Sequence, residues 1–177
     1  MAFINIEIKA RTGNPDMIRQ YLTENGAEFK GIDRQTDTYF KVDNGRLKLR
    51  QGNIENNLIY YSRAETSGLK QSDVEMVSSG DAEGLKSVLT KALSVKTVVN
   101  KEREIYYISN VKFHIDKVDG LGSFVEIEAS NRFEDIPEEK LRQQCEQYMK
   151  EFEIREEDLL NKSYSDMVLE KSLFSLL

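Results

Sequence analysis

Charged side chains of both signs alternate with apolar ones in several short segments of this chain. Residues 4–11 read Ile-Asn-Ile-Glu-Ile-Lys-Ala-Arg, and a strand there places Glu7 and Lys9 on the face opposite the isoleucines. The segments that alternate in a similar way are 45–50, 58–63, 101–108, 111–116 and 124–129. The acidic residues on these charged faces are Glu7, Asp116, Glu126 and Glu128. The basic residues are Lys9, Arg46, Lys48, Arg50, Arg63, Lys101 and Arg103.

These charged faces have two interpretations. Each segment taken alone is typical of a strand with one buried face and one solvated face. If the charged faces all point inward, the chain forms a β-barrel with a charged lumen, and helices cover the apolar faces. Burying unpaired charge costs several kcal/mol per ion, so such a lumen must hold water or a ligand of mixed character. A polyphosphate with a divalent metal fits, because cations hold phosphate oxygens and carboxylates hold the metal.

The composition excludes several other kinds of protein. The chain has 177 residues and a formal net charge of -6, which argues against a general nucleic-acid surface. With only Cys145 and His114, it has no intrachain disulfide and no metal site built from several cysteines or histidines. Metal ligands are therefore expected to be carboxylates, which suit Mg²⁺, Mn²⁺ or Ca²⁺. With no signal peptide and no apolar run of membrane-spanning length, we expect a cytoplasmic protein that binds no membrane.

Helix signals interrupt and follow the strand segments. Asn14-Pro15 predicts the start of one helix and Asp81 the start of another. A third helix is predicted from residues 136–139, and a fourth near Glu156. The apolar stripe of the helix after Asp81 is Leu85, Val88, Leu89, Ala92 and Leu93. The fourth helix is expected to carry Leu159, Leu160, Met167 and Leu169.

These elements predict one α+β domain over residues 1–177. About eight strands and two helices occupy residues 1–130, and a helical part occupies residues 136–177. The final residues, 173–177, are expected to pack on the body of the protein or on a partner chain. The other predicted features are an extended stretch at 28–43, a turn at 43–45, a loop at 66–71 and a strand at 72–77.

Five blocks of the sequence carry a resemblance to a known family. Ile6-Glu7-Ile8-Lys9 is similar to the end of a Glu-x-Glu-x-Lys signature, and Leu47-Lys48-Leu49-Arg50 to a Leu-Arg-hydrophobic-Arg strand. Residues 101–106 resemble Lys-Arg-Arg-x-x-Tyr, and residues 163–167 resemble a closing Ser-Tyr-x-Asp-Leu. Residues 115–128 resemble the long block Asp-x-Val-x-Gly-Leu-Gly-x-Phe-x-Glu-Ile-Glu. In this order, which covers nearly the whole chain, the blocks resemble the CYTH superfamily, the triphosphate tunnel metalloenzymes.

The resemblance implies an eight-stranded antiparallel β-barrel whose charged lumen is a tunnel for ATP or another triphosphate, with helices packed outside. It implies Mg²⁺ or Mn²⁺ as the cofactor, held by Glu7, Asp116, Glu126 and Glu128. The residues expected to bind substrate are Lys9, Lys48, Arg50, Arg63, Lys101 and Arg103. The residues expected to act in catalysis are Glu7, Lys9, Arg103 and Asp116. The class IV adenylate cyclases of this family also suggest a homodimer.

The sequence departs from the family pattern at two positions. Asn5 replaces the first glutamate of the signature, and an amide can coordinate metal through its oxygen but is neutral and cannot act as a base. Tyr61 replaces a phosphate-binding lysine that usually ends a Leu-Thr-Tyr-Lys strand. Arg63 lies two residues on and on the same strand face, so it is expected to supply the missing charge.

Three functions stay open from the sequence. The first is a class IV adenylate cyclase-like enzyme that converts ATP to cyclic AMP and pyrophosphate. The second is a triphosphatase, in which water attacks thiamine triphosphate, inorganic triphosphate or a nucleotide. The third is a module that binds a phosphorylated ligand without turnover, which the neutral Asn5 keeps open. No motif decides how a base and a ribose would be held at the tunnel mouth.

Several residues near the charged faces also have structural interpretations. Arg46 is interpreted as a solvated turn residue in preference to a ligand, and Lys112 as a rim or structural charge. His114 shares a face with Asp116, as a tunnel residue or as a structural histidine. Asp37, within Thr-Asp-Thr-Tyr-Phe, is expected mainly to fix strand pairing, with catalysis as the less favoured role.

Overall fold

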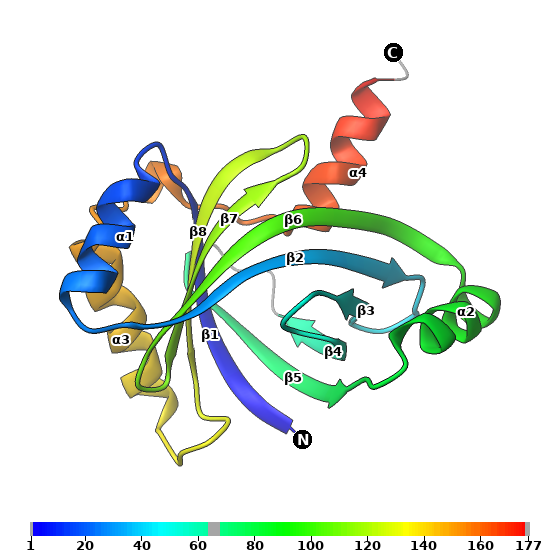
Figure 1. Ribbon diagram of the computed structural model, residues 1–177, viewed down its shortest axis with the longest axis horizontal. Coiled ribbons are helices and arrows are strands. Elements are labelled where there is room, and N and C mark those ends of the chain that lie inside the picture. The colour runs from blue at the N-terminus through cyan, green and yellow to red at the C-terminus, as the bar shows by residue number, and fades with distance from the viewer. Residues whose placement is uncertain (1, 64–67, 176–177) are drawn as a thin grey trace.

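Eight antiparallel strands close into a barrel in this computed structural model, which describes residues 2–63 and 68–175 (Figure 1). The strand order around the barrel is β1-β5-β4-β3-β2-β6-β7-β8. The strands are β1 (Ala2–Arg11), β2 (Glu28–Phe40), β3 (Arg46–Gln51), β4 (Asn57–Arg63), β5 (Lys70–Ser78), β6 (Val95–Ile108), β7 (Val111–Val118) and β8 (Gly122–Ser130). The predicted α+β fold with an eight-stranded antiparallel barrel is therefore confirmed.

Four α-helices lie outside the barrel. They are α1 (Pro15–Glu24), α2 (Ala82–Leu93), α3 (Glu138–Glu151) and α4 (Tyr164–Phe174). The first begins as predicted, because the Asn14 side chain accepts a hydrogen bond from the backbone N–H of Met17 at 3.3 Å. Helices α1 and α3 lie together at one side of the barrel, and α4 projects away from it (Figure 1). None of the described helices is long and apolar enough to cross a membrane.

The apolar core lies between the barrel and the helices α1 and α3. On β1, Ile6 and Ile8 are buried in this core, together with Phe113 of β7 and Ile127 of β8. Leu141 of α3 packs into the same cluster. Burial of each such side chain contributes about 1.5–3 kcal/mol to folding. Because strand side chains alternate between the two faces, the covering helices direct the charged residues of the same strands into the lumen.

Helix α2 forms where it was predicted, but its apolar stripe is not buried. No residue of α2 is fully buried, and the Val88 side chain is 63% exposed. The helix lies at the end of the barrel away from α1 and α3 (Figure 1), where it contacts β2 and β3. Leu85, Leu89 and Leu93 are half-buried there. The apolar stripe of α2 therefore packs on the rim of the barrel and not on the main core.

The prediction that the fourth helix begins near Glu156 is wrong. A single 3-10 turn, η1 (Glu156–Asp158), is followed by an extended segment, and α4 begins only at Tyr164. Leu159 and Leu160 lie along β1, where the backbone N–H of Leu160 donates to the Lys9 carbonyl at 2.9 Å. The backbone N–H of Leu159 donates to the Glu156 carbonyl at 3.2 Å, and the Leu160 carbonyl accepts from Lys70 Nζ at 2.9 Å. These backbone groups are thus satisfied without a helix.

The remaining segments agree with the sequence in part. Residues 28–40 form one long strand, β2, with an irregularity between Phe29 and Gly31. Gly45 turns the chain into β3 with a φ of 62°, a conformation that favours glycine. The predicted loop at 66–71 lies partly outside the described residues, and β5 begins at Lys70, earlier than expected. Leu173 and Phe174 are exposed, and residues 176–177 lie outside the described residues.

Candidate active site

The lumen of the barrel encloses a cavity of about 650 Å³. Of the described residues that line it, nine are Lys or Arg and seven are Asp or Glu, although the whole chain has a net charge of -6. This local excess of positive charge favours an anionic ligand. The predicted site residues among those lining the cavity are Glu7, Lys9, Lys48, Arg50, Arg63, Lys101, Arg103, Glu126 and Glu128.

Strands β1, β7 and β8 form an acidic wall of this cavity. In the register of β1 and β8, Lys9 lies opposite Glu126 and Glu7 lies opposite Glu128. The Lys9 Nζ atom forms an ion pair with Glu126 Oε1 at 2.9 Å. Arg63 of β4 reaches the same wall, where its Nη1 atom donates to Glu7 Oε1 at 2.6 Å. Arg63, which is expected to supply the positive charge missing at Tyr61, therefore points into the lumen, where its partner is the carboxylate of Glu7.

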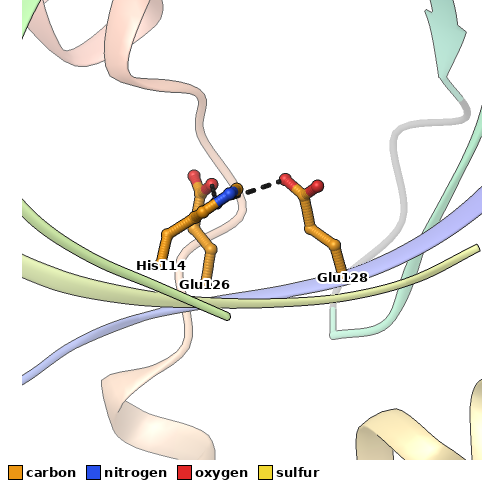
Figure 2. A group of neighbouring side chains, drawn as sticks. All are labelled: His114, Glu126 and Glu128. Carbon is orange, nitrogen blue, oxygen red and sulfur yellow. Dashed lines mark hydrogen bonds and ion pairs between the residues drawn. The ribbon is translucent and has the colours of Figure 1, made fainter. Parts of the chain in front are cut away.

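A histidine and two glutamates converge on this wall (Figure 2). The His114 Nδ1 atom lies 3.0 Å from Glu126 Oε2 and 3.6 Å from Glu128 Oε1. One ligand atom from each of the three residues lies within 4.8 Å of the other two. We call these three residues the His/Glu cluster. The family resemblance implies that the two glutamates bind metal, whereas the sequence leaves the role of His114 open, because the face of a strand does not reveal which side chains lie next to it.

The protonation of the His/Glu cluster fits a divalent cation. Burial, helped by the charge of Arg103, lowers the pKa of His114 to about 3, so the imidazole is neutral at pH 7. Its Nε2 atom is buried and has no hydrogen-bond partner within residues 2–63 and 68–175. Burial, together with the neighbouring Glu126 carboxylate, raises the pKa of Glu128 to about 7. The charges of Lys112 and Arg103 do not offset these two effects, and a bound cation would supply more positive charge.

Asp116 is held apart from the His/Glu cluster by Arg103. The Arg103 guanidinium donates from Nε to Asp116 Oδ1 at 2.7 Å and from Nη2 to Oδ2 at 2.6 Å. The same Nη2 atom donates to Glu126 Oε2 at 2.8 Å. The hydroxyl of Tyr164 also donates to Asp116 Oδ2 at 2.8 Å. Both oxygens of this carboxylate are thus occupied, and in this arrangement Asp116 orients the guanidinium of Arg103.

Strands β2, β3 and β6 form a basic wall around a buried carboxylate, Asp37. Its oxygens accept hydrogen bonds at 2.9–3.0 Å from Lys48, Arg50 and Lys101. Burial alone would raise the pKa of Asp37, but the charges of Arg50, Lys101 and Lys48 hold it well below its usual range. Burial lowers the pKa of Lys101 to about 7 despite the attraction of Asp37. These contacts show a counter-ion role that strand pairing alone does not describe.

Glu55 and Lys112 are two further charged residues of the lumen that lie outside the predicted set of site residues. Glu55, in the turn between β3 and β4, accepts from Arg50 Nη1 at 2.9 Å and also pairs with Lys112. Lys112 is therefore a lumen charge and not only a rim charge.

Arg46 lies outside the cavity, where it pairs with Asp166 at 2.9 Å and contacts Ser163. It is thus an anchor for the start of α4, neither a ligand nor a solvated turn residue.

The two ends of the cavity differ. Near Lys9, the Tyr164 ring lies 4.0 Å from the ammonium group, and the extended segment before α4 runs alongside β1. Phe3 lies six residues earlier on β1, roughly 20 Å away along a strand, among residues that also line the cavity. We call the end near Tyr164 the inner end and the end near Phe3 the mouth. Asn5, which replaces the first signature glutamate, lines the cavity between Phe3 and Glu7.

Comparison with known proteins agrees with this geometry. The sequence matches the CYTH domain over residues 4–164. A protein from Methanocaldococcus jannaschii, named "Putative adenylate cyclase", is 27% identical over an alignment of 177 positions. The alignment covers 93% of this chain and 98% of that protein. The solved structure of a Pyrococcus horikoshii protein superposes with a TM-score of 0.75 at 26% identity and covers 92% of this chain and 98% of its own.

A more distant structure shares the fold alone. It is a Hippeastrum protein, described as a "putative adenylyl cyclase" with a dominant triphosphatase activity, with a TM-score of 0.65 at 13% identity. It covers 96% of this chain and 95% of its own. Since the CYTH match spans most of the sequence and the lumen has the expected charged walls, the chain belongs to the CYTH domain family.

Proposed function

We propose that this protein is a divalent-metal-dependent enzyme that acts on a triphosphate in its lumen, as an adenylate cyclase that converts ATP to cyclic AMP and pyrophosphate. The observation that carries the proposal is the pairing of the His/Glu cluster with a basic wall in one cavity of about 650 Å³. The M. jannaschii relative, with its printed name, supports the choice of reaction.

The basic residues of the lumen are suited to bind the phosphates. Those proposed to contact phosphate oxygens are Lys9, Lys48, Arg50, Arg63, Lys101 and Arg103. Each forms an ion pair with a carboxylate in the structure, so its direction is set before substrate arrives. Such preorganised cations stabilise the charge that develops on a leaving pyrophosphate. Asp116 contributes by holding Arg103 in place with two hydrogen bonds.

The acidic wall is suited to hold Mg²⁺ or Mn²⁺. Glu126 and Glu128 would be ligands, with Glu7 opposite Glu128 in the strand register and His114 beside both glutamates. Asp116, which the family resemblance also assigns to the metal, would first need to be released by Arg103. When bound, a divalent ion polarises a phosphate and lowers the pKa of a hydroxyl next to it. Lys9, paired with Glu126, keeps a positive charge beside the same site.

A triphosphatase is the second candidate. The same residues would bind the triphosphate, and water would attack the terminal phosphorus in place of a ribose hydroxyl. Asn5 bears on this choice, because the missing carboxylate is expected to weaken metal binding or to change which phosphorus is attacked. The Hippeastrum protein, with the same fold, is described as having this activity as its dominant one. A binding module without turnover would also account for Asn5.

Product analysis tests these proposals. Purified protein is incubated with ATP, thiamine triphosphate or inorganic triphosphate, each with Mg²⁺ or Mn²⁺, and the products are separated by chromatography. We expect cyclic AMP and pyrophosphate from ATP, in equal amounts and only with metal. Release of orthophosphate would replace the cyclase with a triphosphatase, and the best substrate would define it. Binding without any product would leave the non-catalytic module.

A further inference from the structure

Glu55 places its carboxylate between two cations from different sides of the lumen. Its Oε2 atom accepts from Arg50 Nη1 at 2.9 Å, and its Oε1 atom pairs with Lys112. Arg50 belongs to β3 and Lys112 to β7, and β2 and β6 separate these strands in the barrel. Burial alone would raise the pKa of Glu55, but the charges of Lys112 and Arg50 lower it, so the carboxylate is ionised. It bridges two cations as two oxygens of a phosphate group would.

The turn between β3 and β4 is fastened so that Glu55 points into the lumen. The buried Asp33 carboxylate accepts from the backbone N–H groups of Ile54 and Glu55 at 2.9 and 3.0 Å. A Cβ atom at Gly52 would lie 2.5 Å from Asp33 Oδ1, so this close approach needs a glycine. Gln35 Nε2 donates to Asp33 Oδ2 at 2.7 Å and to Glu55 Oε2 at 3.2 Å. The backbone of the turn is therefore fixed, and the side chain of Glu55 is the part that can move.

All three nitrogens of the Arg50 guanidinium donate to carboxylates. Nε and Nη2 donate to Asp37 at 2.9 and 3.0 Å, and Nη1 donates to Glu55. The Asp37 side chain is 1% exposed and also pairs with Lys48 and Lys101. The Glu55 side chain is 18% exposed and lies on a turn. An anion that enters the lumen can therefore replace Glu55 on Arg50 more easily than it can replace Asp37.

The bridge made by Glu55 also lies next to the His/Glu cluster. In the register of β7 and β8, Lys112 is directly opposite Glu128. Side chains in such positions begin about 4.5–5.5 Å apart at their Cβ atoms. A phosphate group between Arg50 and Lys112 would thus lie beside a proposed metal ligand, where a triphosphate with its metal is expected.

We propose that Glu55 holds the place of one phosphate group, and that a phosphate of the bound triphosphate displaces it from Arg50 and Lys112. The inference rests on the proposed function, because it requires a triphosphate in the lumen. It adds a phosphate subsite in which Lys112 is a further binding residue. It also makes Glu55 a competitor of the ligand. In the free protein, Glu55 offsets the repulsion between the two cations.

Calorimetry with a ligand that cannot be cleaved tests this displacement. The ligand is inorganic triphosphate in which both bridging oxygens are replaced by methylene groups, the triphosphate analogue, and it is added with Mg²⁺ to the purified protein. Glu55→Gln keeps the size of the side chain but removes its charge. Lys112→Met removes the cation, alone and together with Glu55→Gln. Glu134→Gln is the matched control, because it removes a different carboxylate that lines the cavity.

We expect Glu55→Gln to bind the triphosphate analogue about tenfold more tightly than wild-type protein, since the ligand no longer competes with a carboxylate. Glu134→Gln should change the affinity less than about twofold. The double variant should lose the gain, because Lys112 is then absent from the subsite. Lys112→Met alone should have a smaller effect, since in wild-type protein its contact with phosphate only replaces its contact with Glu55. This non-additivity distinguishes competition from a structural role, which predicts weaker binding by Glu55→Gln.

The outcomes that contradict the inference separate it from the proposed function. If wild-type protein binds the analogue and Glu55→Gln binds it no more tightly, the displacement is overturned and the triphosphate tunnel stands. An equal gain in Glu134→Gln, or a gain that survives Lys112→Met, would assign the effect to net charge and overturn the subsite. Failure of both wild-type protein and Glu55→Gln to bind would overturn the proposed function and the inference together.

A second variant keeps the test valid if Glu55→Gln does not fold, which its thermal unfolding midpoint would reveal. Glu55→Asp keeps the charge on a shorter side chain, which cannot reach both cations from the fixed turn. It should also bind the triphosphate analogue more tightly than wild-type protein. Binding as weak as that of wild-type protein would overturn the displacement.

Discussion

At the scale of single residues, Asp37 is the counter-ion for the basic wall. Its two oxygens accept hydrogen bonds from Lys48, Arg50 and Lys101, and all four side chains are largely buried. Without this carboxylate, three largely buried cations would repel one another. A triphosphate brings its own negative charge to the same donors. Asp37 therefore stabilises the fold while the site waits for an anion.

Asp37→Asn should lower the free energy of unfolding by about 3–5 kcal/mol, because it leaves buried cations without their counter-charge. Urea denaturation measures this change. Asp16→Asn is the matched control, since Asp16 pairs with Arg19 at 89% side-chain exposure and should cost less than about 1 kcal/mol. The methylene analogue of inorganic triphosphate should restore part of the lost stability. Equal stability of Asp37→Asn and wild-type protein would contradict the counter-ion role.

Lys101 gives phosphate binding a pH dependence. Its pKa in the folded protein is lowered to about 7 by burial, so the ammonium form is lost as the pH rises through 7. Because only this form attracts phosphate, affinity for the triphosphate analogue should fall between pH 6 and 8.5. At pH 8, binding should draw a proton onto the amine, which calorimetry detects by comparing buffers with different ionisation enthalpies. Lys101→Met should lose this proton uptake, and an unchanged uptake would contradict the assignment.

The residues of the charged faces could be predicted because strand alternation fixes the side on which a side chain lies. Their partners could not be predicted in the same way. Glu55 reaches Arg50 and Lys112 only because the barrel closes and the turn after β3 folds toward the lumen. The proximity of His114 to Glu128 also depends on the register of β7 with β8, which no single segment reveals.

At the scale of elements, α4 and the segment before it complete the inner end of the cavity. Ser163 caps the helix in a capping box with Asp166, and Arg46 donates to both of them. This start places Tyr164 where its hydroxyl reaches Asp116. The sequence shows the resemblance of residues 163–167 to the family's closing block, but it does not show that the helix begins there. The sequence offers two possible helix starts, the apolar residues 159–160 and the Ser-x-x-Asp cap at residues 163–166. The pairing of Leu159 with β1 holds the first of these in an extended conformation, so the helix begins at the cap.

Ser163→Ala should lower the free energy of unfolding by about 1–2 kcal/mol, because the helix loses its cap and Arg46 loses one acceptor. Urea denaturation is again the measurement. Ser172→Ala, on the exposed face of the same helix, is the control and should be neutral or slightly stabilising. If both variants unfold alike, the cap does not hold α4 in place.

At the scale of the whole molecule, charge is divided between surface and lumen. The chain carries a net charge of -6, yet the described lining of its cavity has more cations than carboxylates. The barrel makes this division possible, since each strand sends one face to the helices and the other to the lumen. The order of the motifs predicted this architecture. The mouth was not predicted, because Arg132 and Phe133 follow the last strand in an irregular segment.

The proposed function depends on a divalent cation held in the lumen by the His/Glu cluster. Mn²⁺ binding, followed by electron paramagnetic resonance, tests it directly in wild-type protein and in Glu128→Gln. This variant suits the test, because the pKa of Glu128 is about 7 and a neutral amide at this position should fold with little cost. Glu134→Gln, a carboxylate of the mouth outside the cluster, is the matched control. We predict that Glu128→Gln weakens Mn²⁺ binding at least tenfold while Glu134→Gln leaves it unchanged, and that the triphosphate analogue tightens Mn²⁺ binding in wild-type protein. Equal Mn²⁺ affinity in wild-type protein and Glu128→Gln would contradict the metal site.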